Sequence, residues 1–406
     1  MAPPRPWTSL PPLLADVGVV GMVPEQWSNL WQPRHHVLRR LAAFFNVVWL
    51  NPAPGWRQLG WSRRSPPDAP PDAGWAIDDA PPYLPTVHRP AWLRTLLRRA
   101  RIRRARRRLL RQGARSIVLY LWRPGFADAL ESPHDLSVYH IDDDYAFDEA
   151  RVGLTALEAN TIRRVDQVII HSPRLMELKG SLNPHTTYVP NGVDFAACST
   201  RTPEPADLAA IPRPRIGYAG WIKPQLDWAL LDAAAARCPE MSFVFVGHLM
   251  PLERLSADPA YRELIRRPNV FFLGMKTSDE LAGYHQHFDV CTMPYRIDPY
   301  TDCIYPLKLH EYLASGRPVV GTPIHSLKGF SGAVMLAQGP DQWREALLRA
   351  IAPESNTESQ RLARQRIARE HEWWGLTGQI AELIARGLNH PGAEGIRDRA
   401  AACIQV

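Results

Sequence analysis

Two series of short apolar segments, both rich in β-branched residues, constrain the fold of this chain most strongly. The first series occupies residues 17–22, 47–50, 117–121, 137–141, 167–171 and 187–189. The second occupies residues 215–218, 242–246, 270–273, 289–293, 319–322 and 333–336. Helical patterns separate the segments within each series, and this alternation is typical of parallel sheets covered by helices. The sequence therefore predicts an α/β protein with two Rossmann-like halves.

The boundaries of these halves follow from changes in composition. Residues 196–214 are rich in Pro, Thr and Ala and have weak periodicity, so they are predicted to be a linker. The halves are then residues 1–195 and 215–370. Residues 371–406 continue a helical pattern, and we expect them to pack back on the first half through Trp373 and Trp374.

Composition narrows the class of protein further. The chain has 406 residues, of which 45% are hydrophobic and 22% charged, as in ordinary folded proteins. No apolar run approaches the ~18 residues of a spanning helix, and prolines interrupt the N-terminal segment before a signal-like core forms. We therefore expect a cytoplasmic protein. Its five cysteines are widely spaced without a Cys-x-x-Cys, which predicts thiols rather than disulfides or a zinc site.

Several standard catalytic signatures are absent from the sequence. It has no Gly-x-Gly-x-x-Gly, no Gly-rich loop ending in Gly-Lys-Ser/Thr, no Gly-x-Ser-x-Gly and no His-Glu-x-x-His. These absences argue against a dinucleotide oxidoreductase, a P-loop phosphotransferase, a serine hydrolase and a zinc protease.

The positive charge of the chain is concentrated in one segment. The net charge is +7, and 11 arginines without one acid lie between Arg94 and Arg115, so the rest of the chain is slightly acidic. Leucines recur there at nearly helical spacing, which predicts an amphipathic helix. Its arginines either form a solvated face or dock on an anionic membrane surface. Nucleic-acid binding is not expected, because no zinc-finger, RNA-recognition or interleaved aromatic pattern accompanies the charge.

The segment Tyr305-Pro-Leu-Lys-Leu-His-Glu-Tyr-Leu-Ala-Ser-Gly316 carries the most specific chemistry. Pro306 suits the first turn of a helix and Gly316 its end. Lys308 and Glu311 then lie on neighbouring faces of a helix whose free N–H groups can hold an anion. In a nucleotide-sugar site, the amides and Lys308 would bind the diphosphate and Glu311 the ribose hydroxyls. The alternative is an exposed surface pair of little energetic value.

Three adjacent carboxylates, Asp142, Asp143 and Asp144, follow a predicted strand of the first half. Crowded carboxylates can bind a divalent metal, position an acceptor hydroxyl or deprotonate it, because crowding raises at least one pKa. Neighbouring side chains of an extended segment point apart, which argues against the metal. The remaining alternative is a helix cap or a solvated loop.

Short motifs along nearly the whole chain resemble those of the group 1 glycosyltransferases of the GT-B fold. The similarity is greatest to bacterial enzymes that build capsular and cell-wall polysaccharides such as teichuronic acid. The motifs are Trp31-Gln-Pro-Arg-His35, Tyr139-His-Ile-Asp-Asp-Asp-Tyr145, Val189-Pro-Asn-Gly-Val-Asp194, Ile216-Gly-Tyr-Ala-Gly-Trp221, Phe243-Val-Phe-Val-Gly247, Asn269-Val-Phe-Phe-Leu-Gly274, Phe288-Asp-Val290 and the segment from Pro306 to Pro323.

The resemblance implies two Rossmann-like domains that face each other across a cleft. It also implies transfer of a sugar from a nucleotide-diphosphate sugar to a glycan or lipid-linked acceptor in cell-surface polysaccharide or glycolipid biosynthesis. In this family the transfer usually retains the anomeric configuration, and neither an obligate metal nor another cofactor is expected. Such an enzyme would work in the cytoplasm, in part at the inner face of the cell membrane.

The same resemblance implies three groups of site residues. Asp143 and Asp144 align with an acidic pair and, with Lys308, are the implied catalytic residues, whereas Asp142 is extra. The implied acceptor-binding residues are Arg34, His35 and His140. The implied donor-binding residues are Glu311, Lys308, Gly220, Trp221, Lys223, Gly247, Gly274, Met275, Lys276, Tyr305 and Leu307.

Two positions depart from the family pattern. A glutamate often lies eight positions before the one that matches Glu311, and Cys303 occupies that place here. The family's phosphate-binding Arg and Lys after the first strand of the second half are replaced by Trp221 and Lys223. These departures keep two alternatives open: a catalytically degenerate GT-B scaffold for membrane or partner binding, and a GT-B nucleotide-sugar epimerase.

Overall fold

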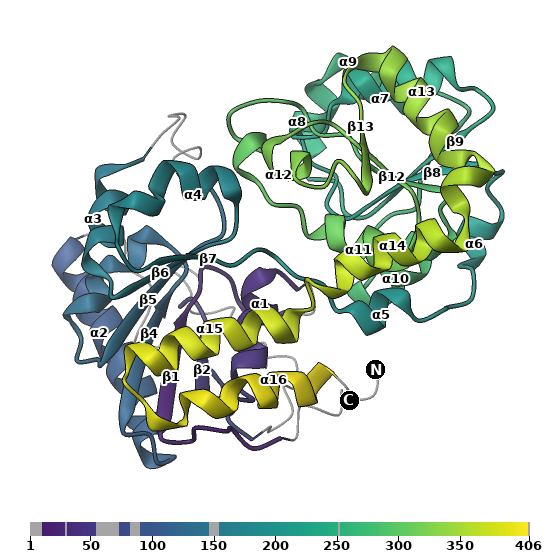
Figure 1. The fold of residues 1–406 in the computed structure, drawn as a ribbon. Helices are drawn as coiled ribbons and strands as arrows, with labels where there is room; N and C mark the ends of the chain where they lie inside the picture. Colours follow the sequence, from purple (N-terminus) through teal and green to yellow (C-terminus); the bar gives the residue numbers. More distant parts are fainter. Residues whose placement is uncertain are drawn as a thin grey trace. The chain divides into compact units, whose positions relative to one another are not determined.

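The computed structural model describes residues 10–28, 31–53, 73–81, 90–145, 154–250 and 252–404. The chain divides into two compact units (Figure 1). The first comprises Met1–Pro190 with Trp373–Val406, and the second Asn191–Glu372. The first unit is therefore built from both ends of the sequence, and the second from one continuous segment.

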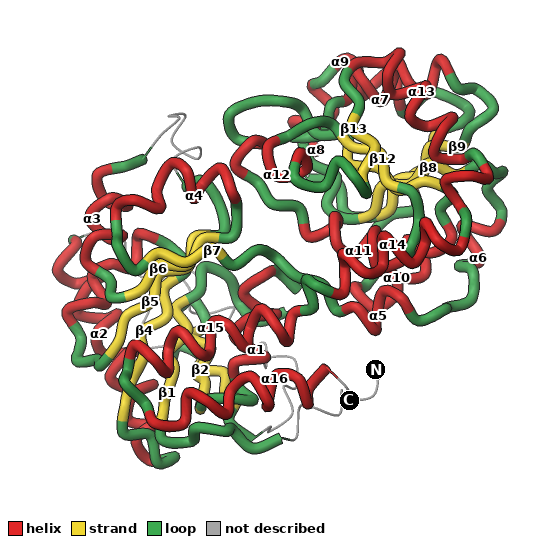
Figure 2. The backbone as a smooth tube through the Cα atoms, in the orientation of Figure 1, coloured by secondary structure: helices red, strands yellow, loops and turns green. Residues whose placement is uncertain are grey.

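A parallel sheet of seven strands forms the centre of the first unit, in the order β3-β2-β1-β4-β5-β6-β7. Figure 2 labels these strands except β3. The strands are β1 (Val17–Met22), β2 (Asn46–Leu50), β3 (Trp75–Asp78), β4 (Ser116–Leu121), β5 (Leu136–Ile141), β6 (Gln167–Ile170) and β7 (Thr186–Tyr188). All six segments predicted from the first series are strands. The sequence does not predict β3, because this edge strand is short and contains only one β-branched residue.

Helices of the first unit come from both ends of the chain. They are α1 (Pro33–Leu41), α2 (Ala91–Arg111), α3 (Ala156–Arg164), α4 (Pro173–Lys179), α15 (Trp373–Gly387) and α16 (Ile396–Ile404), with the short 3-10 helices η3 (Pro124–Glu131), η5 (Gly180–Leu182) and η8 (Pro391–Gly395). Helix α15 packs on α1, where the ring of Trp373 stacks on His36 at a centroid distance of 4.9 Å. Trp374 lies beside Phe44, 6.5 Å away, and under the guanidinium of Arg40.

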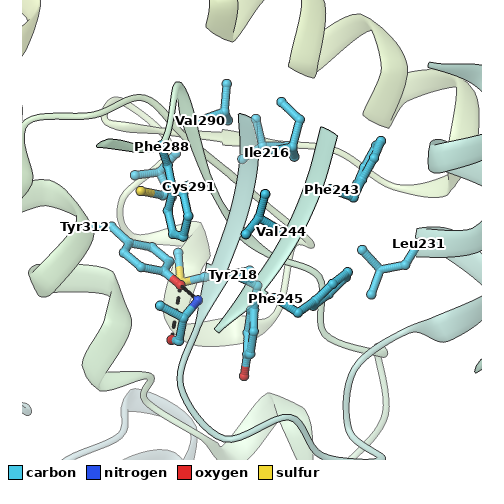
Figure 3. Packing of buried hydrophobic residues seen from close by; sticks show 14 of the residues in the cluster. Ile216, Tyr218, Leu231, Phe243, Val244, Phe245, Phe288, Val290, Cys291 and Tyr312 are labelled. Atoms are coloured by element: carbon cyan, nitrogen blue, oxygen red, sulfur yellow. Dashed lines mark hydrogen bonds between the residues drawn. The ribbon is translucent and has the colours of Figure 1, made fainter. Parts of the chain in front are cut away.

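The second unit has a parallel sheet of six strands, in the order β10-β9-β8-β11-β12-β13. The strands are β8 (Arg215–Ala219), β9 (Ser242–Val246), β10 (Val270–Phe272), β11 (Val290–Met293), β12 (Val319–Gly321) and β13 (Val334–Leu336). All six were predicted. Figure 3 shows side chains of β8, β9 and β11 packed with Leu231, Phe288 and Tyr312 in the hydrophobic core.

Ten α-helices and two 3-10 helices of the second unit lie within the described residues. They are α5 (Phe195–Ser199), α6 (Ala206–Ala209), α7 (Trp228–Arg237), α8 (Leu252–Ala257), α9 (Pro259–Leu264), α10 (Ser278–His287), α11 (Leu307–Ser315), α12 (His325–Lys328), α13 (Gly339–Ile351) and α14 (Glu358–Arg369), with η6 (Thr301–Cys303) and η7 (Pro353–Asn356).

Residues 196–214, predicted as a linker, are packed parts of the second unit. They contain most of α5 and all of α6. The side-chain amide of Gln286 donates hydrogen bonds to the carbonyls of Cys198 and Thr200, and its oxygen accepts one from the Thr202 N–H. Helix α10 therefore satisfies the polar backbone of this segment. Weak periodicity here reflects short helices held by side chains, a pattern that composition does not distinguish from a linker.

Two further expectations concern the whole chain. No disulfide joins the five cysteines, all of which are described and buried, as predicted. Among the residues that the structure describes, no helix has the length and apolar character to cross a membrane.

Candidate functional site

The strand order of the second sheet reverses between β8 and β11, since the chain leaves β8 toward β9 on one side and β11 continues toward β12 on the other. Ligands of open parallel sheets bind outside the carboxyl ends of the strands at such a switch point. The residues that follow β8 are Gly220 and Trp221, and Pro294 and Tyr295 follow β11. The donor residues predicted from the sequence begin at this place.

Glycines allow the backbone segments after β8 and β9 to approach each other closely. A Cβ atom built on Gly247 would lie 1.8 Å from the carbonyl oxygen of Gly220, and both glycines have positive φ, 142° and 130°. Any side chain at position 247 would therefore collide with backbone. This requirement explains the glycine in Phe243-Val-Phe-Val-Gly247.

Lys308 reaches the same switch point from the first turn of α11. A Cβ atom on Gly220 would lie 2.4 Å from Cε and 2.5 Å from Nζ of Lys308, so the lysine occupies the space that the glycine leaves. Its ammonium group lies 4.9 Å from the centre of the Tyr218 ring. Helix α11 has no side-chain cap and no acidic residue in its first turn, so its positive end is not neutralised locally.

Glu311 lies one turn further along α11 and is half-buried. Burial raises the pKa of its carboxyl, and the charge of Lys308 acts in the opposite direction. Among the described residues, Glu311 has no hydrogen-bond or ion-pair partner, and it does not pair with Lys308. Lys308 and Glu311 therefore do not form the exposed surface ion pair that was the alternative interpretation of their spacing. A half-buried carboxylate without hydrogen-bond donors favours a ligand with hydroxyl groups.

Contacts from Tyr312 within the helix and from its C-terminal residue Gly316 hold α11 in this position. The hydroxyl of Tyr312 accepts a hydrogen bond of 2.9 Å from the N–H of Ala219 and donates one of 3.3 Å to its carbonyl, as Figure 3 shows. At the C-terminus, Gly316 adopts a left-handed conformation and its carbonyl accepts a hydrogen bond of 2.9 Å from Arg364 of α14. The helix ends where Gly316 predicted. Pro306 is its N-cap residue, one position before the predicted first turn.

The other predicted donor residues have different surroundings. Lys276 forms an ion pair of 2.7 Å with Asp207, which neutralises the charge of the lysine. Met275, the preceding residue, is 62% exposed. Lys223 lies 5.5 Å from the Trp221 ring. Tyr305 is buried with its hydroxyl 2.8 Å from Nε2 of His310, and Leu307 opens α11. Gly274 has a positive φ of 72°, and no atom lies within 4 Å of the position of a Cβ. These contacts favour Lys308 over Lys276 as the cation for a diphosphate.

In the first unit the strand order reverses between β1 and β4. Charged side chains follow β1 and β5, the strands on either side of β4. Asp142 follows β5 and forms an ion pair of 3.1 Å with Arg34, which also contacts Glu25 after β1 at 3.1 Å. None of the sequence motifs contains Glu25. Its position shortly after β1, where site residues of parallel sheets lie, is the sequence feature that could have predicted it as a site residue.

The three adjacent aspartates have three different environments. Asp144 is buried and lies 3.1 Å from Nζ of Lys179, which also contacts Glu158 at 2.9 Å. Asp143 is half-buried, and its carboxylate accepts a hydrogen bond from the Asp144 N–H. Burial and the neighbouring Asp142 raise the pKa of Asp143. Asp144 therefore belongs to a buried ionic cluster, and Asp143 is the better candidate for an acid–base role.

The predicted acceptor residues His35 and His140 are both enclosed in the core. His140 lies between the Trp122 ring, 4.2 Å away, and the Tyr120 hydroxyl, 2.8 Å from its Nδ1. Burial lowers the pKa of His140 well below its usual range and that of His35 to about 3. These surroundings favour a packing role for both. Arg34 is nearly buried, but it lies among the charged residues after β1 and β5.

The carboxylates of the aspartate run do not come together in one group. Across the described ranges, no group of three His, Cys, Asp or Glu side chains is arranged to hold a metal ion. The three carboxylates instead contact different partners, because successive side chains of an extended segment point in different directions.

Part of the chain is similar to a known protein family. Residues 213–352 match the model of the group 1 glycosyl transferases. The chain is 30% identical over 239 residues to the putative teichuronic acid biosynthesis glycosyltransferase TuaH of Bacillus subtilis (strain 168). That match covers 56% of this chain and 58% of the relative, so the chain spans somewhat more than half of the length of that protein.

Solved structures agree on the fold. Sucrose-phosphate synthase from Thermosynechococcus elongatus superposes with a TM-score of 0.68 at 16% identity, covering 91% of this chain and 98% of that one. Anabaena Alr3699/HepE, in complex with UDP and glucose, gives a TM-score of 0.63 at 15% identity, covering 91% and 99%.

The two parallel sheets and the superposition on these solved structures define a GT-B fold. Within this fold, residues 213–352 are similar to the group 1 glycosyl transferases.

Proposed function

We propose that this chain transfers a sugar from a nucleotide-diphosphate sugar to a glycan or lipid-linked acceptor in cell-surface polysaccharide or glycolipid biosynthesis. One observation carries the proposal: the ammonium of Lys308 lies against Gly220 at the uncapped N-terminus of α11, with the half-buried carboxyl of Glu311 one turn away. The similarity to a teichuronic acid glycosyltransferase and to a protein solved with UDP and glucose supports this choice of substrates.

Each group at the switch point has a function in such a transfer. As the bond from the sugar to the diphosphate breaks, negative charge grows on the leaving phosphate. Lys308 and the free N–H groups of α11 are fixed near that charge and stabilise it more in the transition state than in the ground state. Glu311, when ionised, accepts hydrogen bonds from two ribose hydroxyls. Tyr312 keeps the helix at the end of β8, so both groups hold their positions without the ligand.

In the first unit, Asp143 is the proposed partner of the acceptor hydroxyl. Burial and the neighbouring Asp142 raise its pKa, which suits a carboxyl that takes part in proton transfer. Arg34 and Glu25, which both follow β1 in the sequence, complete the charged surroundings. We further propose retention of the anomeric configuration, no requirement for a metal, and action in the cytoplasm at the inner face of the membrane.

A donor screen tests the proposal. Uridine, guanosine and thymidine diphospho-sugars are added to the protein and its thermal unfolding is followed, because a ligand at 100 times its Kd stabilises by about 2.7 kcal/mol. The donor that raises the melting temperature is then incubated with candidate acceptors, with and without a chelator. We expect transfer that the chelator leaves unchanged.

The two alternatives give different results in this screen. A degenerate scaffold binds no donor, or binds one without transfer or hydrolysis. An epimerase releases an isomer of the sugar when no acceptor is present. Either result would overturn the proposed transfer.

A further inference from the structure

Helix α2 has a face that packs on the first unit and uses some of its arginines there. Ile102, Ala105 and Leu109 are fully buried, and the helix contacts β1, β2 and η3. On the flanks of this face, Arg98 donates to the carboxylate of Asp128 and to the carbonyl of Gly125, Arg101 donates to the carbonyl of Asn51, and Arg104 pairs with Asp78 at 3.3 Å. These arginines therefore have structural partners within the unit.

The opposite face of α2 combines exposed apolar and basic side chains. Trp92 is 67% exposed, Leu96 52% and Leu110 38%, and Arg103 and Arg107 are exposed between them. At 100° per residue, these five residues fall within about 60° of one another around the helix axis. The helix contains no acidic residue, and Arg103 and Arg107 make no ion pair with any residue that the structure describes.

We propose that this face of α2 docks the protein on an anionic lipid bilayer. A Trp and leucines in line with arginines match the boundary between headgroups and acyl chains, where the apolar groups are buried and the guanidinium groups contact phosphate. A nucleic acid would attract the arginines but would gain little from Leu96 and Leu110. An acidic protein would need its own apolar surface. The lipid surface satisfies both kinds of side chain at once.

This inference deepens the proposed location at the inner face of the membrane, but its test uses neither donor nor acceptor, so it can fail while the proposed transfer stands. The full chain is mixed with vesicles of phosphatidylglycerol and phosphatidylcholine, or of phosphatidylcholine alone, and the bound fraction is measured by co-sedimentation. We expect binding to the anionic vesicles only, and a loss of that binding in high salt, because charge attraction near the surface is screened. Equal binding to both vesicle types, or no binding, would overturn the proposal.

Variants localise the contact. The double change Arg103→Gln/Arg107→Gln should lower the partition coefficient about 25-fold, since one basic residue near an anionic surface contributes a factor of about five. Trp92→Ser should also weaken binding, but without changing its salt dependence. Arg254→Gln/Arg344→Gln, an equal loss of charge at exposed positions of the second unit, serves as the control.

Two comparisons distinguish docking of α2 on lipid from attraction by net charge and from binding to a nucleic acid. An equal loss of binding in the Arg254→Gln/Arg344→Gln variant would show that net charge alone is responsible, and would overturn the assignment to α2. Tighter binding to polyuridylic acid than to anionic vesicles at the same ionic strength would favour a nucleic acid instead. Thermal melts exclude unfolding, and the salt dependence of the wild-type protein tests the proposal even where a variant fails to fold.

Discussion

Lys308 occupies the space in which a side chain at position 220 would stand, so the lysine and the glycine are a matched pair. A Cβ on Gly220 would lie 2.5 Å from Nζ of Lys308, well inside van der Waals contact. The two residues are far apart in sequence and meet because Tyr312 fixes α11 to the last residue of β8. The proposed phosphate-binding cation thus depends on a missing side chain on another element.

The first prediction follows from this pair. Gly220→Ala should displace the end of Lys308 and weaken donor binding at least fivefold, while the positive φ of 130° adds strain of about 1–3 kcal/mol. Gly339→Ala is the control, since Gly339 also has a positive φ but no atom near its Cβ position. Isothermal titration of both variants with the donor checks the difference. Equal affinity in the two variants would contradict the role of Lys308.

The second prediction concerns Glu311. Glu311→Ala removes the acceptor of two ribose hydroxyl bonds, each contributing roughly 1.5–3 kcal/mol when charge-assisted, so donor affinity should fall at least tenfold. Burial raises the pKa of Glu311, and the donor requires the ionised form. In the wild-type protein, donor affinity should therefore rise with pH through this raised pKa, and in Glu311→Gln the rise should disappear. Calorimetry at a series of pH values upward from 4.5, the ordinary pKa of a glutamate, measures both effects; unchanged affinity in Glu311→Ala would refute the site.

The third prediction concerns Lys308 itself. Lys308→Ala should lower the turnover number as well as donor affinity, because the charge on the leaving diphosphate is greatest in the transition state. Ala is the best helix former, so α11 should persist. Initial rates at saturating donor, compared with thermal melts, test this expectation. A variant with full turnover and only a higher KM would assign Lys308 to binding alone.

The fourth prediction separates two adjacent carboxylates. Asp144→Leu leaves Lys179 with one partner fewer in a buried cluster and should lower the free energy of unfolding by about 3 kcal/mol or more, as breaking buried ion pairs does. Asp143→Asn should instead lower turnover, with the melting temperature and donor affinity nearly unchanged. Urea unfolding and initial rates of both variants provide the comparison. The reverse pattern would mean that the two roles are exchanged.

The fifth prediction uses a histidine in the core of the second unit. Both ring nitrogens of His285 are buried without a hydrogen-bond partner among the described residues, and burial together with Lys308 lowers its pKa to about 3. A group with a lowered pKa in the folded state supports stability above its unfolded pKa of about 6.5, and this support is lost as the pH falls. Between pH 7 and 5 the loss is about 2 kcal/mol.

A pair of variants tests the histidine prediction. His285→Phe should reduce the loss of unfolding free energy between pH 7 and 5 by that amount, whereas the exposed His248→Phe should not. Urea titrations at the two pH values supply the measurement. An identical pH dependence in the wild-type protein and His285→Phe would show that His285 ionises without opposing the fold.

The sequence by itself determined the features that depend on neighbouring residues. Most strands are short runs of apolar or β-branched residues, so twelve of the thirteen described strands were recognisable, and the order of those runs predicted two parallel sheets. Pro306 and Gly316 marked the ends of α11 because each has a backbone preference of its own. Short segments with a weak pattern were not predicted correctly. The strand β3 lacks a run of β-branched residues, and the composition of residues 196–214 resembles that of a linker.

Only the tertiary structure decided which side chains of each motif are available to a ligand. Asp142, Asp143 and Asp144 are identical in sequence terms, but Lys179, 35 residues beyond Asp144, takes up one carboxylate and Arg34 another. Lys276 and Lys308 both match the family, yet Asp207 pairs with the first. Periodicity and spacing describe local geometry, whereas charge neutralisation and burial depend on residues that the fold brings together from distant parts of the chain.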